Sequence, residues 1–194
     1  MEPARKKRIR RDPDTTRGLI LDATEQVMVE EGYAAVSSRR IAQILGINAA
    51  TVHYYYPTTD DLFLALHHRM MERQKGGLEA VLTAEAPLDA LWKFQSEWDQ
   101  SALGVEFIAL SNHRKAIRPV LAEVTNAARE KQAVALDAVI ALDRAIPLSP
   151  AAFTTILTAI ARTLTNEERV GITHGHREVR DFVAWALREL APRG

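Results

Sequence analysis

The chain has 194 residues, enough to bury one or two cores, and its 25 basic and 25 acidic side chains balance, so net charge does not indicate a nucleic-acid partner. The absence of cysteine excludes a disulfide framework, a thiolate metal site and a cysteine nucleophile. No apolar run has the length of a membrane span and none follows the basic N-terminus, so we expect a soluble, cytoplasmic protein.

Residues 1–14 predict a disordered basic arm, because they offer almost nothing to bury. The basic side chains of this arm lie between Arg5 and Arg11. Such an arm could follow a phosphate backbone, or it could be a solubilising or targeting tail, and its composition fits both. Beside the helical hairpin described below, DNA contact is favoured, and we assign it to Arg5, Lys6, Lys7 and Arg8.

A first long helix is expected over residues 17–31. Thr15 or Thr16 could cap its start, and Gly32 is placed to end it. Apolar spacing predicts an inward stripe of Ile20, Ala23, Thr24 and Val27.

Residues 37–62 predict two short helices joined by a tight turn. Gly46 tolerates the positive φ needed where the first of them stops, and Ser37 and Asn48 are suitable N-caps. The outward side of the second helix carries small and hydrogen-bonding residues without Glu or Lys, whereas a bland hairpin would usually fill that side with solvated charges. This pattern suits insertion into the DNA major groove. The predicted DNA contacts here are Arg39, Arg40, Thr51, His53, Tyr54, Tyr55 and Thr59.

The same region carries several motifs in a fixed order: I-L-D-A-T, E-E-G-Y, I-A-Q-I-L-G-I-N, T-V-H-Y-Y-Y-P and D-D-L-F-L-A-L. From about Thr16 to Leu66 the chain therefore resembles the N-terminal domain of TetR-family transcriptional repressors. The resemblance implies an all-α fold with a three-helix helix-turn-helix domain over residues 15–62. It also implies a helical ligand-binding and dimerisation domain over residues 63–194, where only length and helical character match the family.

Three positions depart from the family pattern. Arg40 stands where an acid usually completes a capping box with the residue at Ser37, so a positive charge is gained beside the DNA. Thr59 replaces a common lysine near the phosphates, and His53 replaces a common tyrosine. Because of these changes, the operator sequence and the affinity for DNA cannot be inferred from the family pattern.

After residue 58 the chain predicts further helices with apolar stripes. We expect breaks where glycine or proline interrupts the pattern, among them Gly104, and a possible kink at Gly76-Gly77. The expected helices cover residues 59–82, 88–102, 105–112, 117–143, 150–165 and 176–190.

The last two of these helices predict a dimer interface. Their apolar residues cover more of the surface than one packing face needs, although both stripes could also pack only within the chain. Because a two-fold dimer reads two half-sites, we favour a homodimer, which the resemblance also implies. The predicted interface residues are Phe153, Ile156, Leu157, Ile160, Val179, Phe182, Val183, Ala186 and Leu190.

The middle helices mix aromatic, flexible and sparse polar residues, as apolar ligand pockets do. Taken singly, each of these residues is better explained as ordinary core. The resemblance implies a pocket whose small, mostly hydrophobic ligand releases the repressor from operator DNA. The predicted lining is Met70, Trp92, Gln95, Trp98, Phe107, Leu110, His113 and Val124.

The sequence does not predict an enzyme, a cofactor or a metal site. The pairs His67-His68 and His174-Gly175-His176 lack the H-E-x-x-H spacing of zinc hydrolases, and no phosphate-binding loop or nucleophile elbow occurs. Two alternatives stay open beside the regulator: a helical protein that sequesters small molecules and has lost DNA binding, and a dimeric protein-interaction module.

Overall fold

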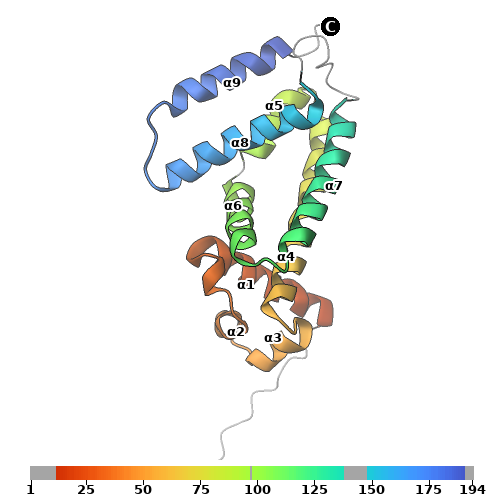
Figure 1. The fold of residues 1–194 in the computed structure, drawn as a ribbon, viewed down its shortest axis with the longest axis vertical. Coiled ribbons are helices and arrows are strands. Elements are labelled where there is room, and N and C mark those ends of the chain that lie inside the picture. Colours follow the sequence, from red (N-terminus) through yellow and green to blue (C-terminus); the bar gives the residue numbers. More distant parts are fainter. Residues whose placement is uncertain (1–11, 97, 138–147, 191–194) are drawn as a thin grey trace, which may run out of the picture. The chain divides into compact units, whose positions relative to one another are not determined.

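A computed structural model describes residues 12–96, 98–137 and 148–190 (Figure 1). Within these ranges the chain forms α-helices and one short 3-10 helix and has no strand, which confirms the all-α expectation. No helix in the described ranges combines the length and the apolarity of a membrane span. Contacts divide the chain into two compact units, Met1–Phe63 and Leu64–Gly194.

The first unit begins with α1 (Pro13–Glu31) and the 3-10 helix η1 (Tyr33–Ala35). It continues with α2 (Ser38–Leu45), α3 (Ala49–Tyr55) and the first turn of α4 (Thr59–Leu82). α2 packs on both α1 and α3. The predicted inward stripe of α1 is buried, as are Leu21 and Met28.

The start of α1 differs from the sequence prediction. Asp12, not Thr15 or Thr16, is the N-cap: its carboxylate accepts hydrogen bonds from the backbone N–H groups of Asp14 and Thr15, both at 3.2 Å. Pro13 follows at the first helical position, where its missing N–H costs nothing. Residues 12–14 therefore belong to the helix and not to the arm, while residues 1–11 lie outside the described ranges.

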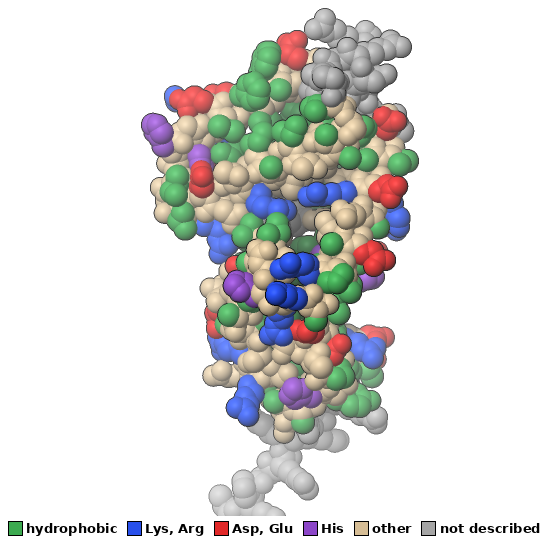
Figure 2. Space-filling model, viewed as in Figure 1, with side chains coloured by type: hydrophobic (Ala, Val, Ile, Leu, Met, Phe, Trp, Pro, Cys, Tyr) green, Lys and Arg blue, Asp and Glu red, His purple; other side chains and the backbone are tan. Residues whose placement is uncertain are grey.

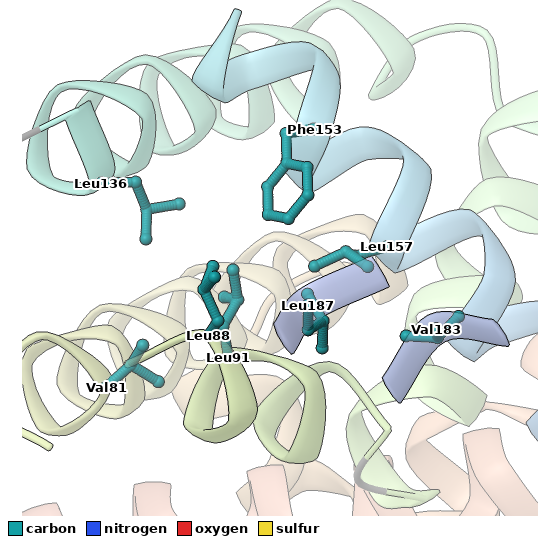
Figure 3. Packing of buried hydrophobic residues seen from close by; sticks show 8 residues of the cluster. All are labelled: Val81, Leu88, Leu91, Leu136, Phe153, Leu157, Val183 and Leu187. Carbon is teal, nitrogen blue, oxygen red and sulfur yellow. The ribbon is translucent and has the colours of Figure 1, made fainter. Parts of the chain in front are cut away.

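The second unit is built around α8 (Pro150–Arg169), which contacts α5 (Pro87–Gln95), α6 (Trp98–His113) and α7 (Arg118–Asp137). The final helix, α9 (His176–Leu190), packs on α5. Figure 3 shows the hydrophobic cluster that joins these elements. Its buried members are Val81, Leu88, Leu91, Leu136, Phe153, Leu157, Val183 and Leu187.

Two glycine positions that were expected to break or bend helices instead lie inside continuous helices. Gly104 is within α6, and the break between α5 and α6 falls after the C-cap Ser96. Gly77 is within α4, where an added Cβ would overlap the ring of Phe94. Close approach of the Phe94 ring accounts for Gly77, whereas an added Cβ at Gly104 would make only an ordinary contact with Arg162.

Candidate DNA-binding surface and ligand cavity

The turn between α2 and α3 is held by caps that the local sequence predicts. Ser37 Oγ accepts a hydrogen bond from the backbone N–H of Arg40 at 3.2 Å, and Asn48 Oδ1 accepts one from Ala50 at 2.8 Å. Gly46 has φ 61° and ψ 35°, the left-handed conformation, and its N–H reaches the carbonyls at the end of α2. These bonds fix the direction in which α3 leaves α2.

α3 has one buried and one exposed side. Val52 and Tyr56 are buried, while Ala50, His53 and Tyr54 are exposed. The Tyr54 side chain is 81% exposed although it is a large aromatic residue. An exposed aromatic ring with a hydroxyl can both pack against and hydrogen-bond to a partner, so Tyr54 is a prominent candidate contact on this helix.

Tyr55 lies between two neighbours on the same surface. Its ring meets Tyr54 edge-on, with centroids 5.1 Å apart, and the guanidinium carbon of Arg17 lies 5.6 Å from the Tyr55 centroid. Arg17 comes from α1, and sequence reasoning missed it because the contact joins helices far apart in the chain. The guanidinium of Arg17 thus lies beside the Tyr55 ring, while its Nη1 is 3.5 Å from the Asp14 carboxylate, which partly compensates its charge.

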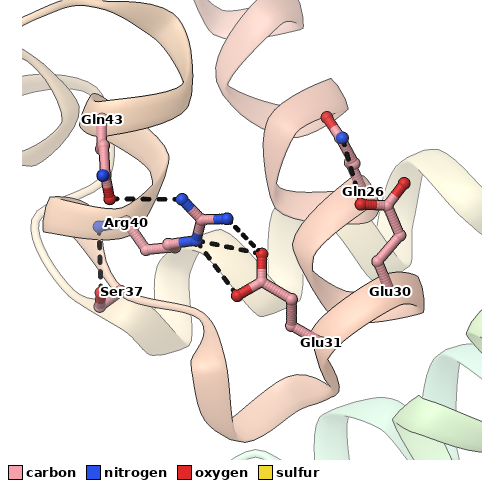
Figure 4. A network of polar contacts seen from close by, with 6 residues as sticks. All are labelled: Gln26, Glu30, Glu31, Ser37, Arg40 and Gln43. Carbon is pink, nitrogen blue, oxygen red and sulfur yellow. Dashed lines mark hydrogen bonds and ion pairs between the residues drawn. The ribbon is translucent and has the colours of Figure 1, made fainter.

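The two arginines of α2 differ in whether an acidic side chain of the described residues compensates their positive charge. Arg40 forms a two-pronged ion pair with Glu31, with its Nη2 2.6 Å from Oε1, and a 3.3 Å hydrogen bond to Gln43 (Figure 4). The hydrogen bond from Arg40 lowers the pKa of Glu31, and the same bond raises the pKa of Arg40. The positive charge expected beside the DNA is therefore compensated by Glu31. Arg39 is exposed and forms no ion pair with any residue that the structure describes.

The N-terminus of α4 is capped by reciprocal hydrogen bonds between Thr58 and Asp61. Thr58 Oγ1 accepts from the Asp61 backbone N–H at 3.1 Å, and the Asp61 carboxylate accepts from the Thr58 backbone N–H at 2.8 Å. Thr59 is half-buried at the first helical position. On α3, His53 Nδ1 lies 3.3 Å from the Pro57 carbonyl, which orients the ring. Contacts of Thr59, His53 and Thr51 with DNA stay predictions, and the arm residues Arg5, Lys6, Lys7 and Arg8 lie outside the described ranges.

A cavity of about 580 Å³ lies within the second unit, among α4, α5, α6, α7 and α8. Four of the predicted lining residues, Met70, Gln95, Phe107 and Val124, line it. The other predictions fare differently: Leu110 is buried in the core, His113 is exposed at the end of α6, and Trp92 packs on the hydrophobic cluster. The side chain of Trp98 lies outside the described part of the chain. Periodicity marks apolar faces but does not distinguish a cavity wall from a filled core.

Two polar residues of the cavity were missed by sequence reasoning, His67 and Arg162. His67 is only 3% exposed, its ring meets Phe107 edge-on at 5.0 Å, and its Nε2 lies 3.4 Å from Thr125 Oγ1. Burial, aided by the neighbouring His68, lowers the pKa of His67 to about 4. The imidazole is therefore neutral near pH 7 and offers a hydrogen bond rather than a charge.

The apolar residues predicted for a dimer interface divide into two groups. Phe153, Leu157 and Val183 are buried in the chain's own core, with Ile160 packed against it, and their contact with a second copy stays a prediction. Ala186 is half-buried, and the side chain of Leu190 is not among those described. An exposed apolar patch remains on α8 and α9, which Figure 2 shows as hydrophobic side chains at the surface. We call it the α8–α9 patch; it consists of Ile156, Val179, Phe182 and Trp185.

Comparison with known proteins places these features in context. Residues 20–66 match the bacterial regulatory proteins of the tetR family. A segment of 77 residues is 34% identical to the HTH-type transcriptional repressor LfrR of Mycolicibacterium smegmatis, a match that spans 40% of this chain and 40% of LfrR.

Solved structures share the fold along nearly the whole chain. A TetR-family transcriptional regulator from Rhodococcus sp. aligns with a TM-score of 0.71 and 17% identity, covering 92% of this chain and 100% of that chain. The multidrug binding protein EbrR, complexed with imidazole, aligns with a TM-score of 0.60 and 23% identity, covering 94% and 98%.

Proposed function

We propose that the chain, whose residues 20–66 match the tetR family of bacterial regulatory proteins, belongs to that family and is a homodimeric transcriptional repressor released from operator DNA by a small ligand. The observation that carries this proposal is the exposed side of α3. A seven-residue helix is held by caps at both flanking turns and presents Ala50, His53 and Tyr54 to solvent. Small residues allow close approach to base edges, and the polar and aromatic ones can contact bases and phosphates.

Dimerisation follows from what a single recognition helix can do. One helix-turn-helix reads a short half-site, and a two-fold dimer doubles the contacts and sets the spacing of the half-sites. The α8–α9 patch supports this part of the proposal, because four large apolar side chains on two adjacent helices are exposed in the single chain.

Ligand control requires a site in which a small molecule can be held. The cavity of about 580 Å³ falls within the usual range of ligand pockets, roughly 300–1,000 Å³. EbrR, which has a similar fold, is known in complex with imidazole. A ligand would relieve repression only if it bound the DNA-free arrangement of the dimer more tightly than the DNA-bound one.

The role of α3 is tested by replacing Tyr54. We expect Tyr54→Ala to weaken binding to the operator by about tenfold or more, since a good contact to DNA contributes ~1–3 kcal/mol. Fluorescence anisotropy measures the dissociation constant, and sedimentation confirms that the variant has the wild-type oligomeric state. Tyr54→Phe separates the contribution of the hydroxyl from that of the ring. An unchanged dissociation constant for Tyr54→Ala would remove α3 from the proposed interface.

A further inference from the structure

The guanidinium of Arg162, which pairs with no acidic side chain among the described residues, lies on the wall of the cavity. Arg162 projects from α8, and the cavity wall includes it. An added Cβ at Gly104 of α6 would lie 3.4 Å from Arg162 Nη2, an ordinary van der Waals distance, so the guanidinium lies directly beside α6. The residue is half-buried, and its Nε is buried without a hydrogen-bond partner.

Nothing that the structure describes compensates this charge. No ion pair joins the Arg162 side chain to any carboxylate of the described residues, and the neighbouring charge that acts on it is that of Arg129, of the same sign. Burial, followed by this repulsion, lowers the pKa of Arg162. A half-buried charge without a partner destabilises a protein, so its presence in a cavity points to a partner that arrives from outside.

The other charged residues that line the cavity are also mainly basic. Figure 2 shows Lys and Arg side chains bordering the hollow that α6, α7 and α8 surround. The acidic lining residues are Glu72 and Glu123, whereas the basic ones are Lys75, Arg118, Arg129, Lys131 and Arg162. His67, neutral near pH 7, adds no charge to either side. The cavity is thus electropositive although the chain as a whole has no net charge.

The part of the lining that α8 contributes is polar throughout, namely Thr154, Thr158 and Arg162, whereas the other helices contribute both polar and apolar residues. Thr158 stands one turn before Arg162 on α8, and its hydroxyl donates to Gln95 Oε1 at 3.0 Å. The apolar lining comes from the other helices of the cavity and includes Met70, Met71, Phe94, Phe107, Ile108 and Leu121. A molecule that matched this wall would have an anionic end toward α8 and an apolar body.

We propose that the cavity binds an amphipathic organic anion, an apolar carboxylate whose carboxyl group pairs with Arg162. This inference rests on the proposed function in taking the bound molecule as the effector, and it replaces the expectation of a mostly hydrophobic ligand. Arginine suits this task because its planar fork can donate two parallel hydrogen bonds to one carboxylate. A cationic ligand of the same size would meet repulsion from Arg162 and Arg129.

Three probes with the same apolar body test the proposal: dodecanoate, dodecanol and dodecylammonium, each below its micellar concentration. Their binding to the full-length protein is measured without DNA, by calorimetry or tryptophan fluorescence. We expect dodecanoate to bind at least about tenfold more tightly than the other two, since a hydrogen bond to a charged group contributes ~1.5–3 kcal/mol. Arg162→Gln should abolish that preference, Arg162→Lys should retain part of it, and Arg177→Gln, which removes an exposed arginine outside the cavity, should leave it intact.

Equal affinity for the three probes, no binding of dodecanoate, or an Arg162→Gln variant that keeps the preference would each overturn the proposal. A thermal measurement guards against loss of fold: without ligand, Arg162→Gln should melt no lower than the wild-type protein, because it removes an uncompensated charge. A lower melting temperature would show that Arg162 has a structural partner and would contradict the account. Operator binding is measured separately. If dodecanoate binds through Arg162 but does not displace DNA, ligand-relieved repression fails while the anion site stands.

Discussion

The neighbouring arginines Arg39 and Arg40 differ in how far other side chains already compensate the positive charge that each could offer to DNA. Arg39 is exposed without an ion pair among the described residues, whereas Arg40 is held by Glu31 and Gln43. We expect Arg39→Gln to reduce the slope of log Kd against log salt concentration by about one, because one phosphate contact is lost. Arg40→Gln should change that slope less, since its charge is already compensated. Anisotropy over a salt series compares the two, and equal losses of slope would contradict the distinction.

His67 connects the burial of a residue to the pH dependence of stability. Its pKa in the folded protein is about 4, while in the unfolded chain it should have the ordinary value near 6.5. Between these values the unfolded chain binds the extra proton, so this residue's contribution to stability is lost as pH falls from about 6.5 to about 4. His67→Gln should therefore show a smaller decrease in the free energy of unfolding between pH 7 and pH 5. Urea unfolding measures it, and an equal decrease in both proteins would rule the contribution out.

At the scale of single residues, the sequence predicted the features that depend on hydrogen bonds between near neighbours in the chain. Ser37, Gly46 and Asn48 form their hydrogen bonds within four residues of themselves, and their roles are visible in the sequence. The pairs Glu31–Arg40 and Arg17–Tyr55 could not be predicted in the same way. They depend on how α1 lies against α2 and α3, which no spacing rule specifies.

Among the elements, α4 provides a matched pair of glycines. An added Cβ at Gly76 meets nothing within 4 Å, but one at Gly77 overlaps the Phe94 ring. Gly76→Ala should stabilise the protein by about 0.5–1 kcal/mol, because alanine loses less backbone entropy in a helix. Gly77→Ala should be less stable than Gly76→Ala by about 1–3 kcal/mol, since Phe94 must move. Chemical denaturation of both variants checks this, and equal stabilities would show that Phe94 shifts at no cost.

The periodic spacing of apolar residues was sufficient to predict which helix faces are buried, but not where every helix ends or what covers each face. It gave the helical stripes of α1, α8 and α9, because each has a face that must be buried. It misplaced the break between α5 and α6 at Gly104, since a glycine inside a continuous helix looks in sequence like one that ends a helix. It did not show that Phe153, Leu157 and Val183 pack within the chain's own core, because an apolar stripe does not specify what covers it.

For the whole molecule, the α8–α9 patch predicts the oligomeric state. Phe182 is 59% exposed, and Phe182→Glu would place a charge within the proposed apolar interface. We expect this variant to sediment as a monomer and to lose most of its operator affinity. Val134→Glu is the matched control, because Val134 is also an exposed apolar side chain, 71% exposed on α7. A Phe182→Glu variant that stayed dimeric would place the interface elsewhere.

The central claim, that this chain recognises a particular DNA sequence, is tested most directly by anisotropy with labelled DNA flanking its own gene. A scrambled duplex of the same composition serves as the control, and both are titrated across a range of salt concentrations. The account predicts saturable binding of at least one dimer per site, with a preference for the flanking sequence that persists at physiological salt. Equal binding to both duplexes that disappears as salt rises, or no binding to either at low salt, would contradict it.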